Sequence, residues 1–257
     1  MKGLLKYIFT FLFAMILALP ALGQVDHSDD NEEMEFPAAP LCNARIEFDH
    51  TLFDFGSITK GSSVAHSFWF TNNGSDTLVI TKIKPTCGCT VTKKGGITAA
   101  PGERAYVDII FNSGKFNGRV TKSINIETND NLNPYLDIRF KSTINDPLLI
   151  FDYTPLQADF RNVAEGKGGD FKITITNKDK TNSKIKIVDQ PETSMIKVKL
   201  DKTELKAGES TTIQFTLSKD IPADSYLSSV TLEADGKANS RFTIPISING
   251  GDKTASK

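Results

Sequence analysis

The chain contains few of the residues that build disulfide scaffolds and imidazole-based active sites. It has three cysteines and three histidines among 257 residues. Three cysteines are too few to hold a domain together by disulfides, so the fold must depend on a hydrophobic core. The formal net charge is only −1, which argues against a nucleic-acid binder. The sequence also lacks the nucleophile-elbow, zinc-protease, phosphate-loop and Cys-x-x-Cys motifs, which argues against the enzyme classes that they mark.

Long hydrophobic runs are absent except at the N-terminus. There, two lysines precede residues 7–19, an apolar run interrupted by one threonine, and small residues follow it. A helix of this length spans about 20 Å, which is less than the ~30 Å hydrocarbon core of a bilayer. We therefore predict that residues 1–23 are a signal peptide cleaved near Gly23 and Gln24, with an uncleaved membrane anchor as the alternative. The mature protein is expected in the periplasm or outside the cell, without a stable membrane anchor.

Residues 24–44 have a composition that does not favour a folded structure. They contain six acidic residues, and the first basic residue after them is Arg45. A segment with high charge and few apolar side chains cannot offset the entropy lost on ordering. We predict an acidic disordered linker at 24–44 and a flexible tail at 251–257.

Alternation of apolar and polar residues dominates the rest of the chain, and it is typical of β-strands. In residues 64–71, for example, one set of alternate positions holds a valine, His66 and two phenylalanines. Short motifs then recur at an offset of 105 or 106 residues: Asp54-Phe55 as Asp159-Phe160, Thr71-Asn72 as Thr176-Asn177, and Pro101-Gly102-Glu103 as Ala207-Gly208-Glu209. Such self-similarity predicts two tandem domains of one fold, at residues 45–145 and 146–250.

About seven short strands in about 100 residues, separated by frequent turns, are typical of an immunoglobulin-like sandwich. We therefore predict an all-β protein of two tandem immunoglobulin-like β-sandwich domains, with a closed barrel as the alternative.

Several motifs of the first domain carry a more specific resemblance: Phe53-Asp54-Phe55-Gly56, Pro85-Thr86-Cys87-Gly88-Cys89-Thr90, Pro101-Gly102-Glu103 and Glu127-Thr128-Asn129-Asp130. In these motifs the first domain resembles the DUF1573 family, a bacterial Ig-like domain of unknown function that is common in Bacteroidetes and similar to the Ig-like repeats of HYDIN and ASH proteins. The resemblance implies an Ig-like fold and an exported location, and it implies no activity.

The Cys87-Gly88-Cys89 motif is the sharpest chemical feature, because the second domain has no cysteine. Three interpretations remain open. The two cysteines could form a strained disulfide, since residues i and i+2 of a strand lie about 6.6 Å apart, near the limit for such a bond. They could ligate a soft metal such as copper or zinc, with further ligands from His66, Cys42 or another protein. Finally, one of them could pair with Cys42 while the other stays buried.

Two further side chains are candidates for a role beyond the core. Trp69 has Thr174 as its repeat equivalent and is predicted on the outward face of its strand, where it is either a partner-binding anchor or covered by the leader or a neighbouring strand. His66 is predicted to be a partly buried core histidine, because its repeat equivalent is Phe171. His50 is expected in solvent.

Together these features predict an exported, non-enzymatic module that binds a protein partner or acts as an envelope scaffold. No cofactor is expected, and neither nucleic acid nor a membrane is expected as a partner. A thiol-redox or soft-metal function at Cys87 and Cys89 is the alternative. A third interpretation is a small envelope chaperone that offers a strand edge to its client.

Overall fold

Strands account for all of the regular secondary structure in the described part of the chain. The computed structural model describes residues 42–86, 89–91, 95–163, 167–191, 195–219 and 226–248, with only the backbone described at 89–91. The predicted signal peptide, most of the acidic linker and the C-terminal tail lie outside these ranges. Within them, no helix has the length and hydropathy needed to cross a membrane.

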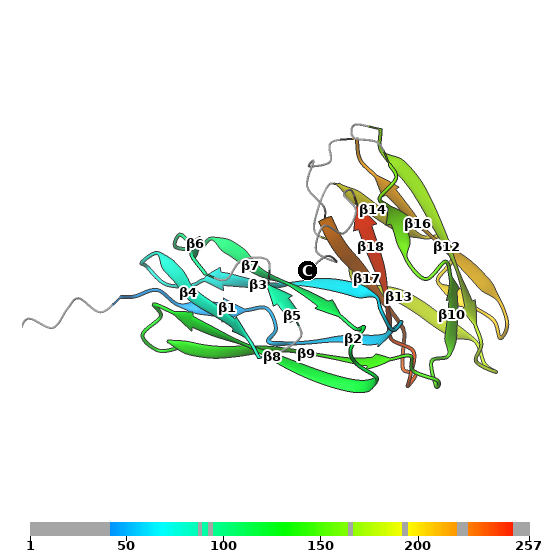
Figure 1. The fold of residues 1–257 in the computed structure, drawn as a ribbon, viewed down its shortest axis with the longest axis horizontal. Coiled ribbons are helices and arrows are strands. Elements are labelled where there is room, and N and C mark those ends of the chain that lie inside the picture. The colour runs from blue at the N-terminus through cyan, green and yellow to red at the C-terminus, as the bar shows by residue number, and fades with distance from the viewer. Residues whose placement is uncertain are drawn as a thin grey trace, which may run out of the picture. The chain divides into compact units, whose positions relative to one another are not determined.

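The first domain consists of two facing layers of strands (Figure 1). Its described strands are β1 (Ile46–Phe48), β2 (Leu52–Ile58), β3 (Ser63–Asn72), β4 (Leu78–Pro85), β5 (Cys89–Val91), β6 (Ile97–Ala99), β7 (Arg104–Asn112), β8 (Gly118–Thr128) and β9 (Tyr135–Ile144). One layer has the order β1-β3-β7-β5, and the other has the order β2-β9-β8-β4-β6. The space between them is filled by a hydrophobic cluster that includes the fully buried Phe55, Phe68, Phe111 and Phe140.

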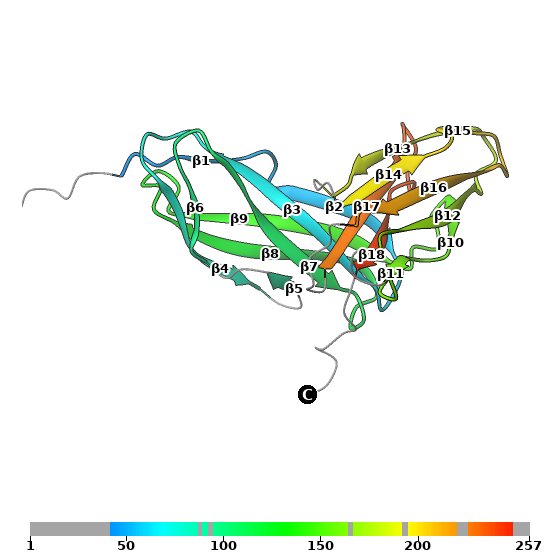
Figure 2. The ribbon, with the colours of Figure 1, turned by 90° about the horizontal axis from the view of Figure 1, so that it is seen from above.

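The second domain repeats this plan with its own core. Its described strands are β10 (Phe151–Thr154), β11 (Ala158–Phe160), β12 (Gly169–Asn177), β13 (Ser183–Asp189), β14 (Ile196–Leu200), β15 (Glu204–Leu205), β16 (Ser210–Leu217), β17 (Tyr226–Ala234) and β18 (Phe242–Ile248). Figure 2 shows β14, β16, β12 and β10 side by side as one layer. The other layer contains β15, β13, β17 and β18, with β11 parallel to β18. A separate hydrophobic cluster, which includes Phe151, Phe215 and Phe242, fills this sandwich.

The alternation that predicted strands is visible in the burial of β3. Its even-numbered residues from 64 to 72 are buried, while the odd-numbered residues between them are half-buried. Successive side chains of a strand point to opposite faces, so one set enters the core and the other meets the outer face. This architecture confirms the predicted all-β fold of two sandwiches, and it is not the closed barrel.

The repeated motifs correspond to one hydrogen-bond arrangement that is used twice. The Asn72 side-chain amide donates to the backbone oxygens of Asp76 and Ala99, at 2.8 and 2.9 Å. The Asn177 amide donates to the oxygens of Thr181 and Leu205, at 3.0 and 3.3 Å. Each asparagine is fully buried and ties the end of its strand to the turns beside it. The sequence repeat therefore reflects the need to satisfy buried backbone carbonyl groups at equivalent places.

The two sandwiches share one sheet. β18 of the second domain pairs in parallel with β2 of the first through Phe242 and Ser57, which extends a single ten-stranded sheet across both domains. All described residues belong to one compact unit, Pro40–Lys257. The contact between β2 and β18 places side chains of both domains around common cavities.

Candidate functional site

The two domains meet where β2 lies beside β18. Ser57 N donates to Arg241 O at 2.8 Å, and Thr243 Oγ1 donates to Phe55 O at 2.6 Å. Gly56 lies between these bonds with a φ of +65°, and a Cβ at this position would stand 2.2 Å from the Arg241 carbonyl oxygen. Only glycine combines this left-handed conformation with so close a backbone approach. The glycine of the Phe-Asp-Phe-Gly motif is thus required by the junction.

A second contact joins β3 to β17. β1 pairs with one edge of β3, but only at Phe70–Asn72. Nearer to the start of β3, the backbone groups on this edge have no partner in β1. At Ala65 the second domain closes this edge, because the backbone N–H donates to Ser229 Oγ at 2.8 Å. An N–H removed from water without an acceptor would cost about 1–3 kcal/mol, so this bond stabilises the contact between the domains.

His66 lies at the same junction, in the buried position that the alternation predicted. Its ring stacks on Phe53, with the ring centroids 3.6 Å apart. Its Nδ1 is 3.0 Å from Asp189 Oδ2, and its Nε2 is 2.9 Å from His50 Nε2. When a neutral His66 donates its Nδ1–H to the carboxylate, its Nε2 accepts the Nε2–H of His50. The prediction of a core histidine is correct for His66, while the exposed His50 is also its hydrogen-bond partner.

The environment of His50 favours its neutral form. The pKa of His50 lies below 6.5, mainly because the His50 ring is partly removed from water. The neighbouring His66 lowers the pKa further. The carboxylates of Asp189 and Asp49 act in the opposite direction. A proton added to His50 would place a positive charge on a partly buried ring beside His66, which the net effect of these causes opposes. The hydrogen bond between the two rings is therefore favoured at neutral pH and opposed by acid.

A groove of about 440 Å³ lies between the outer face of β3 and β7 and the second domain. We call it the junction groove, and its lining includes Ser67, Trp69, Tyr106, Asp108, Tyr226 and Ser228. The Trp69 ring is half-buried, with the Tyr106 ring at a centroid distance of 4.7 Å. The guanidinium of Arg104 lies over the Trp69 ring at 4.3 Å. Neighbours on β7 thus cover part of Trp69, and the residue contributes to the wall of the groove.

Asp108 lies in the same groove and is half-buried. Its Oδ1 accepts a hydrogen bond from Ser67 Oγ at 2.6 Å. Burial raises the pKa of Asp108, although the Ser67 hydroxyl and the charge on His66 act against this. Burial also raises the pKa of Tyr226, and the negative charge of Asp108 raises it further. Sequence reasoning missed Asp108 and Tyr226, because a polar residue on the outer face of a strand is ordinary and only the second domain makes the site concave.

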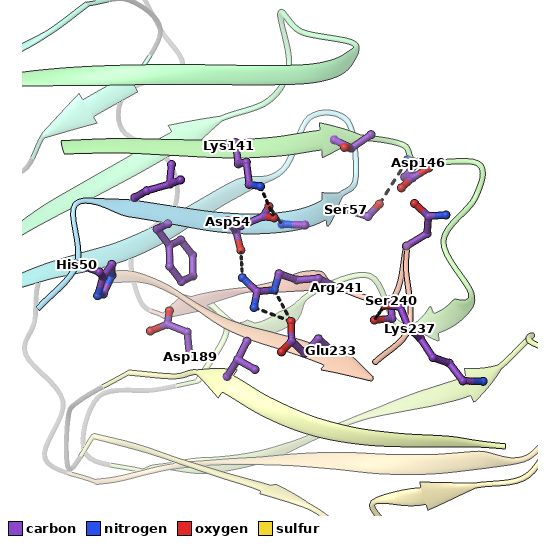
Figure 3. Close-up of a pocket in the computed structure, with 16 residues that line it drawn as sticks. His50, Asp54, Ser57, Lys141, Asp146, Asp189, Glu233, Lys237, Ser240 and Arg241 are labelled. Carbon is purple, nitrogen blue, oxygen red and sulfur yellow. Dashed lines mark hydrogen bonds and ion pairs between the residues drawn. The ribbon is translucent and has the colours of Figure 1, made fainter. Parts of the chain in front are cut away.

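A second cavity, of about 700 Å³, shares His50 and Asp189 with the junction groove (Figure 3). Arg241 projects into it, where its Nε donates to Glu233 Oε2 at 2.7 Å and its guanidinium reaches the Asp54 backbone oxygen at 3.4 Å. The side chain of Asp54 in turn pairs with Lys141 at 3.3 Å. Each ion pair lies within one domain, and the hydrogen bond from Arg241 to the Asp54 backbone oxygen is the one of these contacts that joins the two domains.

The cysteine candidates are described only in part. Cys87 lies outside the described residues. Of Cys89 only the backbone is described, and it belongs to β5 and pairs with Phe111 of β7. Cys42 has a free thiol that accepts a hydrogen bond from Asn129 Nδ2 at 3.3 Å. Among the described residues, no three His, Cys, Asp or Glu side chains are grouped as a metal site would require. The disulfide, soft-metal and structural interpretations of these cysteines stay predictions.

The family models match the two domains separately. Residues 46–144 match DUF1573, a family described as proteins of unknown function. This match confirms the resemblance seen in the motifs of the first domain. Residues 149–249 match the HYDIN/CFA65/VesB-like Ig-like domain. Ig-like domains of this kind are typically protein-interaction modules, and they are typically not enzymes.

Several solved structures are similar to this chain at low identity. A protein of unknown function from Porphyromonas gingivalis W83 is 10% identical, with 79% of this chain and 99% of that chain covered and a TM-score of 0.35. The CupB2 chaperone of Pseudomonas aeruginosa is 12% identical, with 77% and 98% covered and a TM-score of 0.32. An ASH / PapD-like domain of human CEP192 is 11% identical, with 42% and 90% covered and a TM-score of 0.33. No curated protein matches the chain.

Proposed function

We propose that this protein is an exported, non-enzymatic module that binds a protein partner through the junction groove. The Ig-like matches support an interaction module, and the predicted signal peptide at residues 1–23 supports export. The observation that carries the proposal is the half-buried Trp69 in the wall of a groove, beside Tyr106 and Arg104. Tryptophan, tyrosine and arginine are the residues most enriched among those that dominate interface energetics.

The junction also supports binding by holding the groove in shape. The groove has one wall from each domain, and the domains are joined by the bonds of Ser57 and Ala65 across the junction. A site that is already formed loses less conformational entropy on binding than one that must be assembled. Partner binding should therefore depend on the junction as well as on the groove.

Recovery of the partner from the cells that make this protein tests the proposal. A tagged wild-type protein, a Trp69→Ala variant and a Tyr135→Ala variant are compared, with urea unfolding of each as the stability control. Tyr135 is a matched control because it is an aromatic side chain that is 77% exposed and lies outside the groove. Loss of a hot-spot residue weakens binding by about 30-fold or more, so Trp69→Ala should lose the partner while Tyr135→Ala retains it. Equal recovery with Trp69→Ala, or no partner with the wild type, would contradict the proposal.

A double Cys87→Ser, Cys89→Ser variant separates this proposal from the thiol or soft-metal alternative. If binding is through the groove, the double variant recovers the same partner in the same yield. A bound metal ion or a mixed disulfide that disappears in the double variant, together with the partner, would instead support the alternative.

A further inference from the structure

We infer that the junction groove accepts a lysine or arginine side chain of the partner, placed beside Asp108. This inference rests on the proposed function and specifies its ligand chemistry. It depends on the charges in the groove, on the aromatic rings beside them and on the partial burial of one carboxylate.

Asp108 is the one acidic side chain of the groove lining that forms no salt bridge within the described part of the chain, and His66 acts on it only through its more distant charge. Its Oδ1 accepts a hydrogen bond from the neutral hydroxyl of Ser67, at 2.6 Å. The other two aspartates of the lining are already paired: Asp49 with Arg104, and Asp189 with His66. A carboxylate that is half removed from water without a counter-ion is unfavourable, and a cation that enters the groove would offset that cost.

The raised pKa of Asp108 agrees with this geometry. Burial is its main cause, and the hydrogen bond from Ser67 does not cancel it. A cation bound beside the carboxylate would favour the ionised form and lower that pKa again. In the free protein, burial thus disfavours the charged form of Asp108, and a bound cation would favour it.

Aromatic residues line the groove together with Asp108. Tyr106 and Tyr226 line the groove with Asp108, and burial and the Asp108 charge both raise the pKa of Tyr226. A ring face attracts a cation, and an arginine can also stack on it. An acidic peptide or a phosphate backbone would meet the charge of Asp108 instead of complementing it. The groove therefore favours a basic protein segment over an acidic one or a nucleic acid.

Trp69 offers a direct measurement, because it is the one tryptophan of the chain and lies in the wall of the groove. The purified protein is titrated with blocked pentapeptides that carry Arg, Gln or Glu between glycines, and the Trp69 fluorescence is followed. The Arg peptide should bind about tenfold or more tightly than the Gln peptide, and the Glu peptide more weakly still. Asp108→Asn should abolish the preference for Arg, while the matched charge control Asp152→Asn, an exposed site in the second domain, should keep it.

Three results would overturn the inference. They are equal or absent responses to the Arg and Gln peptides, an Arg preference that persists in Asp108→Asn, and a fluorescence change on concentrating the protein alone, which would assign the groove to a second copy of this chain. Asp108→Asn should fold at least as stably as the wild type at neutral pH, because it keeps the acceptor for Ser67 and removes a half-buried charge.

If Trp69→Ala loses its natural partner but the Arg preference is missing, the proposed function stands and the ligand chemistry fails. If the Arg preference is present but Trp69→Ala keeps its partner, the ligand chemistry stands and the proposed function fails.

Discussion

Gly56→Ala should open the junction between the domains, and the structure gives the size of the effect. The left-handed conformation at +65° costs a residue with a Cβ about 1–2 kcal/mol. The new Cβ would also stand 2.2 Å from the Arg241 carbonyl oxygen, which is far inside van der Waals contact. The strands must then separate, and the hydrogen bond from Ser57 to Arg241 is lost, which costs about 1 kcal/mol more. We expect the free energy of unfolding to fall by about 2–3 kcal/mol.

Gly61→Ala is the matched control for this change. Gly61 also has a positive φ, of +84°, but its Cβ would meet no atom within 4 Å. The control therefore carries the conformational penalty without the steric overlap, and we expect a loss of about 1–2 kcal/mol. Both variants add a Cβ at a positive φ, and only Gly56→Ala adds the overlap at the junction.

Urea unfolding followed by circular dichroism measures both losses, and limited proteolysis of residues 145–150, between the domains, reports whether the junction opens. Gly56→Ala should be the less stable variant and the faster to be cleaved. If both variants lose the same free energy within about 0.5 kcal/mol and are cleaved equally fast, the close approach of β18 does not stabilise the protein and the reasoning fails.

Two further predictions concern the histidine pair and the repeated asparagines. Since the native pKa of His50 lies below 6.5, the unfolded chain binds more protons, and stability should fall as the pH drops through 6.5. His50→Gln removes this contribution, so its Tm should fall less than that of the wild type between about pH 7.5 and about pH 5.5; an equal fall would refute the assignment. Asn72→Ala and Asn177→Ala each leave buried carbonyl oxygens without a donor, and each should lower the free energy of unfolding by about 2–3 kcal/mol in thermal or urea unfolding. A loss below about 1 kcal/mol at either site would contradict the role assigned to that asparagine amide.

Much of the fold could be predicted because its causes are local or repeated. The alternation in residues 64–71 depends on the period of a strand, and β3 buries the residues that this period selects. The recurrence of Asn72 as Asn177 predicted two copies of one fold, and the equivalent hydrogen bonds of the two side chains give the physical reason. His66 was placed in the core by the same register.

The site could be predicted only in part. Trp69 was recognised as an unusual outward residue, but its surroundings come from Arg104 and Tyr106 on β7. The pairing of His50 with His66 depends on which loop lies beside β3, and the place of Asp108 in a groove depends on which domain lies against the outer face of β3 and β7. No spacing along the chain encodes that contact. The role of Cys87 and Cys89, which form the sharpest motif of the sequence, remains a prediction.

The sequence by itself determined an all-β chain, two copies of one sandwich and the buried face of each strand, because side-chain periodicity and buried hydrogen-bond donors act within a strand or between neighbours. Only the tertiary structure decided that β18 would join β2 in one sheet, that Gly56 would permit this approach, and that Asp108 and Trp69 would line a common groove. These features depend on docking of one finished domain against another. Docking depends on contacts between residues more than 100 positions apart, such as Ala65 with Ser229. Such contacts produce no periodic pattern in the sequence of either segment.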